Sequence, residues 1–371
     1  MDPWDDRARQ AADSVTTLFG RRLLGLPGTL LPLVRSPGRR DWSGPWHYWW
    51  LAHYLDALID AVLRERGPGG DPKRADTAYR YAVRLLRTIR LRNLGTFVNH
   101  YYDDMAWLLL AAHRLDQLDP SPLRLARAAG RALTTTVLKA DTPDLGGGLF
   151  WNDTHDFKNV PATAPAAIFF ARTGRRARAA AHIDWIYANL HDPRNGLILD
   201  GLAMKPDGSA DLVGHLFTYN QGTVLGALIE LGDPRSLDRA AALIDAISTQ
   251  QTSDPEHHVL GVHGDGDGGL FTGIAVRYLA LAAQHPQLDP AARATARSLV
   301  LGTASALWKG RQTRSTPKTF GMPSGPVLVF SPDPAVPADK SQPPGISVEL
   351  SSQVQAWTIL EAAATLTPQR R

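Results

Sequence analysis

Apolar residues recur at every third or fourth position along most of the chain, which is the period of an α-helix with one buried face. Short stretches rich in Gly, Pro, Asn and Asp separate these segments, and several prolines stand at or near predicted helix starts, where a missing backbone N–H costs nothing. The pattern predicts about twelve helices: Pro3 to Phe19, Pro45 to Arg66, Pro72 to Leu91, Tyr102 to Leu118, Ser121 to Leu138, Thr163 to Arg172, Arg175 to Leu190, Asn220 to Leu231, Arg235 to Thr249, Leu270 to Gln284, Pro290 to Leu307 and Val348 to Leu366.

Runs typical of strands are few and short, such as His258 to Val262 and Val327 to Phe330, which argues against a parallel sheet. The helices form one uniform series of hairpins without a linker, and we predict a single all-α domain over 1–371. Six hairpins in a ring would bury the apolar faces and gather the connecting loops into a pocket at one end. An open solenoid is the alternative, disfavoured because no fixed sequence period exists. The Pro-rich segment 321–345 is expected to be a long loop, an insertion rather than a functional lid.

Composition excludes several classes of protein. The 371 residues contain no cysteine, which rules out disulfides, thiolate metal sites and a cysteine nucleophile. The net charge of +4 comes from 40 Lys and Arg against 36 Asp and Glu, interspersed along the chain rather than gathered into a nucleic-acid-binding tail. The most apolar stretch, Trp46 to Val62, is interrupted by histidine and aspartate and does not read as a membrane span. No basic and apolar leader opens the sequence, so a cytoplasmic location is expected.

The most informative residues are Asp103 and Asp104, two adjacent acids at the start of an otherwise apolar helix. Aspartate is common at helix N-termini because it caps free N–H groups and complements the helix dipole. That role needs no special position in the fold. The helix beyond these acids is so apolar that we expect it in the inner layer, with both carboxyl groups at the mouth of the ring.

Such a pair has a specific chemistry. Two carboxylates about 5 Å apart repel each other by roughly 3 kcal/mol at an effective dielectric constant of about 20, so one of them keeps its proton near neutral pH. The helix N-terminus offsets only about 0.3–1 kcal/mol of this repulsion. A retaining glycosidase uses one carboxylate to attack the anomeric carbon and one carboxylic acid to protonate the leaving oxygen. The sequence permits this geometry.

Further motifs accompany the pair in a fixed order. Tyr102 to Trp107, which reads Tyr-Asp-Asp-Met-Ala-Trp, resembles the signature of glycoside hydrolase family 76, the endo-α-1,6-mannanases. The later matches are a glycine-rich loop ending in Trp-Asn (Gly146 to Asn152), the dipeptide Lys158-Asn159, a segment with a third aspartate (Asn195 to Gly201), the Tyr-Asn-Gln-Gly of Thr218 to Gly222, and Gly269 to Ile274 followed by Arg277 to Leu279. The ordered set is specific and covers Pro45 to Ala283.

The resemblance implies an (α/α)6 barrel and cofactor-free hydrolysis of α-1,6-linked mannose chains with retention of configuration. By the same resemblance Asp103 is the nucleophile, Asp104 is the general acid/base, and Asp200 binds hydroxyl groups of the attacked sugar. Aromatic rings that pack on apolar sugar faces, beside a few amides and carboxylates that bind hydroxyls, suit such a pocket. The other expected substrate-binding residues are Tyr102, Trp151, Asn152, Asn159, Tyr219, Asn220, Gln221 and Phe271.

The sequence departs from the family's pattern at two places. Thr163 stands where the family has a second Asn, and Pro161 and Pro165 are expected to delay the start of that helix. Thr272 replaces the usual Lys of the Phe-Lys-Gly block, so a charge is missing there. Two alternatives therefore stay open: a transglycosylase or a hydrolase of another α-linked glycan on the same barrel, and a non-catalytic carbohydrate-binding relative. Retention of both acids disfavours the second.

Other patterns carry less weight. The segment 264–269 spells G-x-G-x-x-G, but no βαβ unit surrounds it. The loop that begins with Asp265 and Asp267 resembles a calcium loop, yet Val276 stands where the bidentate Glu belongs. Arginines at 84–92 and 172–178 have helical spacing and are expected to form exposed faces. We expect a monomer without bound metal or cofactor, whose partner is an α-mannoside oligosaccharide or polysaccharide and no nucleic acid.

Overall fold

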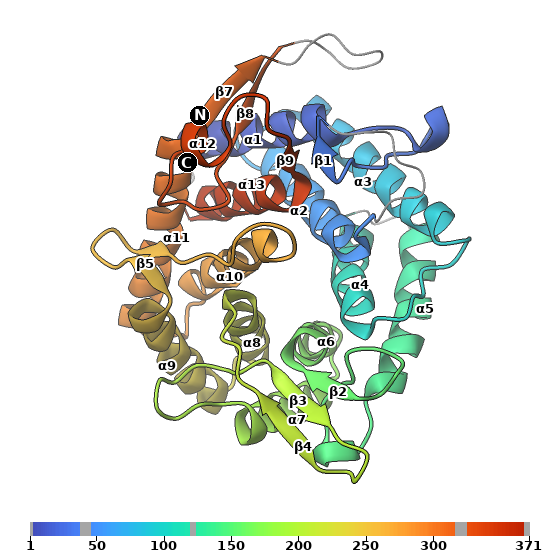
Figure 1. Cartoon of the computed structure of the whole chain (residues 1–371), viewed down its shortest axis with the longest axis vertical. Helices are drawn as coiled ribbons and strands as arrows, with labels where there is room; N and C mark the ends of the chain where they lie inside the picture. The colour runs from blue at the N-terminus through green and yellow to red at the C-terminus, as the bar shows by residue number, and fades with distance from the viewer. Residues whose placement is uncertain (1–2, 38–45, 119–123, 316–324, 367–371) are drawn as a thin grey trace.

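The computed structural model describes residues 3–37, 46–118, 124–315 and 325–366, and these are predominantly helical. Six helices form a closed inner ring in which each helix packs against the next, and an outer helix packs on each of them (Figure 1). This is the predicted ring of six hairpins, an (α/α)6 barrel. The inner helices are α2 (Tyr48–Arg66), α4 (Tyr102–Gln117), α6 (Val160–Arg172), α8 (Thr218–Leu231), α10 (Gly268–Ala283) and α13 (Leu350–Thr365). The outer helices are α1 (Pro3–Phe19), α3 (Pro72–Arg92), α5 (Arg124–Ala140), α7 (Arg176–Asn189), α9 (Pro234–Gln250) and α11 (Pro290–Gly310).

The two layers differ in their sequence pattern, and the difference explains their places. Every residue of α8 except Glu230 is buried, as expected for a helix that is apolar all round. Outer helix α5 instead buries a single stripe of residues three or four positions apart. A helix with one apolar stripe is stable only with its other face in water, so it belongs outside the ring.

Short strands occupy the connections that precede the inner helices. The pairs are β1 (Arg35–Ser36) with β9 (Val348–Glu349), β5 (Thr252–Asp254) with β6 (Val259–Leu260), and β7 (Gln312–Ser315) with β8 (Pro326–Val329). A three-stranded antiparallel sheet joins β2 (Phe157–Asn159), β3 (Gly201–Met204) and β4 (Ala210–Val213). The strand-like runs noted in the sequence overlap β6 and β8. The sheet was missed because strands of three or four residues show no usable period.

Most predicted helix bounds agree with the structure to within three residues, but the expectation for α6 was wrong. This helix is not delayed: it begins at Val160, with Pro161 in its first turn and Pro165 inside it. Pro161 needs no N–H partner there, and the side chain of Asn159 accepts the N–H of Ala162 at 3.1 Å as a cap. The predicted starts at Pro45 and Ser121 lie outside the described residues.

The Pro-rich segment is more ordered than the predicted loop. Residues 321–324 lie outside the described part of the chain, and the remainder contains β8 and the short helix α12 (Ala338–Ser341). The N–H of Leu328 donates to Ser14 Oγ at 2.8 Å, and the N–H of Phe330 donates to Gln353 Oε1 at 2.9 Å. These bonds attach the segment to α1 and α13.

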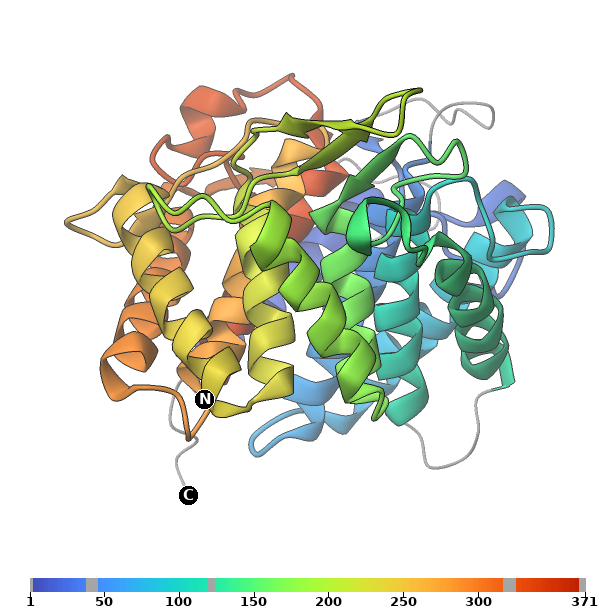
Figure 2. The same ribbon diagram turned by 90° about the horizontal axis from the view of Figure 1, so that it is seen from below.

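All six inner helices run in the same direction, so their N-termini meet at one end of the ring. Figure 2 shows the ring from the side, with β3 and β4 lying over this end. Parallel helix dipoles direct their positive ends toward the end that carries the strands, where they favour negative charge. None of the helices in the described residues is long and apolar enough to cross a membrane.

Candidate active site

The two adjacent aspartates lie at the end of the ring where the inner helices begin. Asp103 and Asp104 occupy the first turn of α4, and both are more than half buried. Asp104 Oδ2 accepts a hydrogen bond from Asn99 Nδ2 at 2.7 Å. Asp103 Oδ1 is buried and has no hydrogen-bond partner among the described residues. Neither carboxyl group forms an ion pair with a cation in that part of the chain, so no positive side chain there neutralises either acid.

Burial controls the protonation of both acids. It raises the pKa of Asp103 to about 7, against the hydrogen bonds from the Trp151 side chain and from nearby backbone N–H groups, which lower the pKa. Burial also raises the pKa of Asp104 well above its usual range, and the negative charge of Asp103 raises it further. The bond from Asn99 opposes this shift. Asp104 is therefore the carboxyl that retains a proton, while Asp103 is the one that ionises more readily.

The glycine-rich loop brings Trp151 to the pair. The N–H of Tyr102 donates to Trp151 O at 2.7 Å, which joins the loop to the first turn of α4. Gly148 has a φ of +72°, and a Cβ there would come within 2.6 Å of the Trp185 ring, so only glycine allows this path. The buried Lys158 Nζ donates to backbone oxygens of this loop, at 2.7 Å for Asp144 O and 2.8 Å for Gly147 O.

A third predicted acid, Asp200, lies just before β3 and is paired with α8. Its Oδ1 accepts a hydrogen bond from Asn220 Nδ2 at 2.9 Å, and burial raises the pKa of its carboxyl. Asn220 is fully buried, and its Oδ1 has no partner among the described residues. Asn220 therefore holds the Asp200 carboxyl in place through its amide nitrogen.

Three predicted binding residues use side-chain amide atoms in hydrogen bonds within the protein. Gln221 Nε2 donates to Ile198 O at 2.7 Å and its Oε1 accepts the N–H of Ile198 at 2.8 Å, so its amide holds the segment before Asp200. Asn159 caps α6. Asn152 Oδ1 accepts the N–H and hydroxyl of Thr154 at 3.1 and 2.6 Å. Gln221 supports the site without offering its amide to a ligand, and Asn159 uses its Oδ1 in the same structural way.

Aromatic rings line the inner surface beside the acids. Tyr219 stacks on Phe271, with centroids 3.9 Å apart and an interplanar angle of 21°, and Trp107 lies 6.5 Å from Tyr219. Burial raises the pKa of Tyr219 well above its usual range, and the charges of Asp200, Asp103 and Asp267 add to the shift. Tyr219 is therefore near all three carboxylates. Tyr102 is buried, and its hydroxyl lies 3.3 Å from His155 Nε2.

A fourth carboxylate, Asp267, belongs to the same end of the ring and was missed as a site residue. Its Oδ1 accepts hydrogen bonds from Trp49 Nε1 at 3.0 Å and Trp50 Nε1 at 2.8 Å. Asp267 precedes α10 but its side chain does not cap that helix. It instead connects α10 to α2 across the ring. The sequence signal was present, an acid directly before an apolar helix, but it was interpreted only as the start of a calcium loop.

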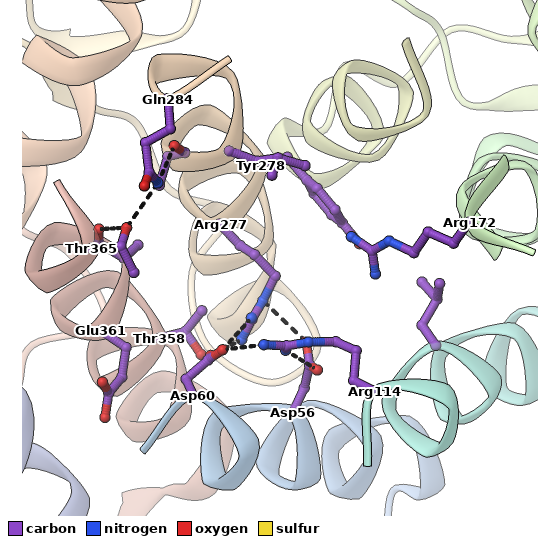
Figure 3. Close-up of a pocket in the computed structure, with 14 residues that line it drawn as sticks. Asp56, Asp60, Arg114, Arg172, Arg277, Tyr278, Gln284, Thr358, Glu361 and Thr365 are labelled. Atoms are coloured by element: carbon purple, nitrogen blue, oxygen red, sulfur yellow. Dashed lines mark hydrogen bonds and ion pairs between the residues drawn. The ribbon is translucent and has the colours of Figure 1, made fainter. Parts of the chain in front are cut away.

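The opposite end of the ring contains a separate cavity of about 180 Å³. Figure 3 shows Arg277 and Arg114 converging on Asp56 and Asp60 there, with Arg172 approaching from the far side. Each charged side chain that lines this cavity has a counterion: Arg172 pairs with Glu230 and Glu361 with Arg64, and the two remaining arginines pair with the two aspartates. Such a self-neutralised set is typical of a structural network. No group of three or more metal-ligating side chains occurs in residues 3–37, 46–118, 124–315 and 325–366.

Comparison with known proteins identifies the family. Residues 4–325 match the model of glycosyl hydrolase family 76. Among solved structures, the α-1,6-mannanase of Salegentibacter sp. HEL1_6 is 28% identical with a TM-score of 0.80, covering 98% of this chain and 100% of that one. An inactive variant of that mannanase, with two consecutive aspartates replaced by asparagine and α-1,6-mannotriose bound, gives 27% identity, a TM-score of 0.79 and the same coverage.

A protein of Listeria innocua is 25% identical with a TM-score of 0.75, covering 98% of this chain and 97% of that one. A search among curated proteins gave no match. The family model spans most of the chain, and the helical ring and the ordered motifs agree with it. The chain therefore belongs to glycosyl hydrolase family 76, and it is a glycoside hydrolase.

Proposed function

We propose that this protein hydrolyses α-1,6-linked mannosides with retention of configuration, with Asp103 as nucleophile and Asp104 as general acid/base. The observation that carries the proposal is the pair itself: two adjacent, largely buried carboxyl groups with raised pKa values and no cationic partner among the described residues. The α-1,6-mannanase activity of a 28% identical relative, and the inactivity of its variant without two consecutive aspartates, support the substrate and the role of the pair.

The first step uses the different environments of the two acids. The carboxylate of Asp103, which is partly accessible at the end of the ring, attacks the anomeric carbon and forms a glycosyl ester. The glycosidic bond breaks, and Asp104 gives its proton to the departing oxygen. The raised pKa of Asp104 keeps that proton in place near neutral pH.

The second step follows from the loss of one charge. Once Asp103 is esterified it is neutral, and the repulsion that raised the pKa of Asp104 disappears. Asp104, now ionised, takes a proton from a water molecule that attacks the anomeric carbon, and Asp103 leaves as a carboxylate. Each of the two steps inverts the configuration at the anomeric carbon, so the two steps together retain it.

Binding of the attacked sugar is assigned to side chains with free polar atoms. The remaining oxygen of Asp200 accepts a hydroxyl hydrogen, Asn220 orients that carboxyl through its amide, and the stacked Tyr219 and Phe271 rings present an apolar surface to the sugar. Trp151 supports Asp103 through its hydrogen bond. Neither Gln221 nor Asn159 is assigned a direct contact.

The test is hydrolysis of linear α-1,6-mannan, followed by release of reducing ends and by NMR of the first-formed anomer. Cleavage that yields the α-anomer first supports the proposal. Products longer than the substrate would indicate transglycosylation, cleavage only of another α-linked glycan would change the substrate, and binding without cleavage would favour a carbohydrate-binding protein. An initial β-anomer would refute the retaining mechanism.

A further inference from the structure

Two neighbouring inner helices present matching stripes of residues along the ring axis. On α2 the stripe is Trp49, His53, Asp56 and Asp60, and on α4 it is Asp103, Trp107, Leu110 and Arg114. Both have the i, i+4, i+7, i+11 spacing of one helix face. The stripes contact each other in register, because His53 packs on Trp107 with ring centroids 4.8 Å apart and Arg114 bonds to Asp56 and Asp60.

This register places His53 about one helical turn, or roughly 5 Å, further into the ring than Asp103. His53 is held on two sides by tryptophans: Trp107 below the catalytic pair, and Trp49, whose ring lies 5.5 Å away in a T-shaped arrangement. Trp49 is in turn fixed by its hydrogen bond to Asp267. His53 thus belongs to the wall that faces the candidate active site, next to the rings already described.

His53 carries a buried polar atom that the protein does not use. Its side chain is only 8% exposed, yet Nε2 has no hydrogen-bond partner among the described residues. An unsatisfied buried polar atom costs about 1–3 kcal/mol. An apolar ring would fill the space between the two tryptophans without that cost, so packing alone does not explain a histidine here.

We propose that His53 is a substrate-binding residue of this glycoside hydrolase, whose imidazole forms a hydrogen bond with a hydroxyl group of the sugar held at Asp103. The inference rests on the proposed function and extends it by one residue. A sugar ring that offers its anomeric carbon to Asp103 reaches about one helical turn deeper into the barrel, which is the level of His53. The stacked tryptophans fix the imidazole before the sugar arrives, so little rotamer entropy is lost on binding.

The protonation of His53 agrees with a neutral polyol as ligand. Burial lowers its pKa to about 3; the charge of Asp56 opposes this shift and that of Arg277 adds to it. The imidazole is therefore neutral at any working pH of the enzyme. A neutral imidazole has one donor and one acceptor nitrogen, and a sugar hydroxyl group can pair with either.

The experiment measures binding without turnover. The parent is the full chain with Asp103→Asn, and the probe is α-1,6-mannotriose, titrated by calorimetry. His53→Phe in this parent keeps an aromatic ring and removes the nitrogen, and we expect an affinity about ten-fold lower, as for the loss of one buried hydrogen bond. Thermal unfolding of the free protein is expected to stay the same or to rise, because an unsatisfied nitrogen is removed. A purely structural histidine would instead lower stability and affinity together.

The matched control is His182→Phe. His182 is also buried, also has an Nε2 without a hydrogen bond among the described residues, with Asp141 Oδ2 3.5 Å away, and packs on Phe170, but it lies on the outer helix α7. We expect this variant to bind mannotriose like the parent. Equal affinities of the parent and the His53→Phe variant, within two-fold, would overturn the inference and leave the proposed function intact. Absence of mannotriose binding by the parent would overturn the proposed substrate, and the inference with it.

Discussion

Two pairs of aspartates lie at opposite ends of the inner ring, and their surroundings give them opposite properties. Asp56 and Asp60 form ion pairs with Arg114 and Arg277, with Arg114 Nη2 2.6 Å from Asp60 Oδ1 and Arg277 Nη2 2.6 Å from Asp60 Oδ2 (Figure 3). Burial by itself would raise the pKa of Asp56, but the two arginines outweigh it and hold the pKa at about 2. Asp103 is also buried, has no such cation, and has a pKa near 7.

The comparison teaches that counterions, and not burial, distinguish an acid that stays ionised from one whose pKa lies near neutrality in this protein. Asp56 is fixed in the ionised state at any physiological pH. Asp103 and Asp104 instead share their ionisation near neutrality, and each depends on whether the other is charged. An acid/base catalyst needs a pKa of this kind, close to the working pH, because its protonation state must change during the reaction.

The largest expected effect comes from replacing the acids of the candidate active site. Asp103→Asn or Asp104→Asn is expected to lower kcat on α-1,6-mannan by at least about 10³-fold, since the amide can neither attack nor exchange a proton. The measurement is the rate of reducing-end release, with circular dichroism to verify the fold. Asp238→Asn, an exposed acid on α9, is the control and should be fully active. Near-normal turnover by either site variant would remove that residue from its role.

The next largest effect is a loss of stability on disturbing the ion pairs of Asp56 and Asp60. Arg114→Met removes one of the two cations and leaves two buried carboxylates with Arg277 alone. We expect the free energy of unfolding to fall by about 3–5 kcal/mol, measured by urea denaturation at pH 7. The double variant Arg114→Met with Asp60→Asn restores the charge balance and should recover part of the loss. A loss below about 1 kcal/mol in the single variant would mean that solvent screens these charges and that the ion pairs contribute little to stability.

The two pairs should also respond to pH with opposite signs. The pKa of Asp103 is raised to about 7 from about 3.9 in the unfolded chain, so the folded state binds more protons between these values, and stability falls as pH rises from about 4 to 7. Asp103→Asn removes the group whose ionisation lowers the stability of the folded state. The variant should be more stable than the wild type above pH 7, by on the order of 1–3 kcal/mol, with no gain near pH 4.

Asp56→Asn is the reciprocal case. Its folded-state pKa is lowered, so the ionised form contributes stability above about pH 4, and this contribution is lost as pH falls toward 2. The variant should therefore be less stable than the wild type at neutral pH, with a difference that shrinks on acidification. Urea titrations at pH 3, 5 and 7.5 measure both effects, and differences that do not vary with pH would contradict the pKa values of both residues.

The smallest expected effect concerns Asn99, which donates to Asp104 Oδ2 and so favours its ionised form. Asn99→Ala removes this bond and raises the pKa of Asp104. Because Asp104 must be protonated to act as the acid, the basic limb of the kcat/KM profile should move to higher pH by about 0.5–1 unit. An unchanged limb, or a shift to lower pH, would mean that another group controls it.

The sequence predicted the helices well because they depend on local patterns, and a local pattern also singled out the two adjacent acids at the start of α4. Apolar residues on all sides of α4 and α8, against one apolar stripe on α5, separate inner from outer helices without any knowledge of contacts. The motif of Gln221 predicts a ligand contact, and only the structure shows that its amide bonds to the backbone of Ile198. The three-stranded sheet escaped prediction because short strands obtain their hydrogen bonds from one another.

The sequence by itself determined that this chain is a ring of helical hairpins with two adjacent acids at the start of an inner helix. Only the tertiary structure decided which acids are neutralised and which polar atoms stay free. Asp60 meets Arg277 from 217 residues away, and the indoles of Trp49 and Trp50 meet Asp267 from a similar distance. The pKa of a buried group depends on the charges and donors within a few ångströms, and no local pattern records which distant residues the fold brings there.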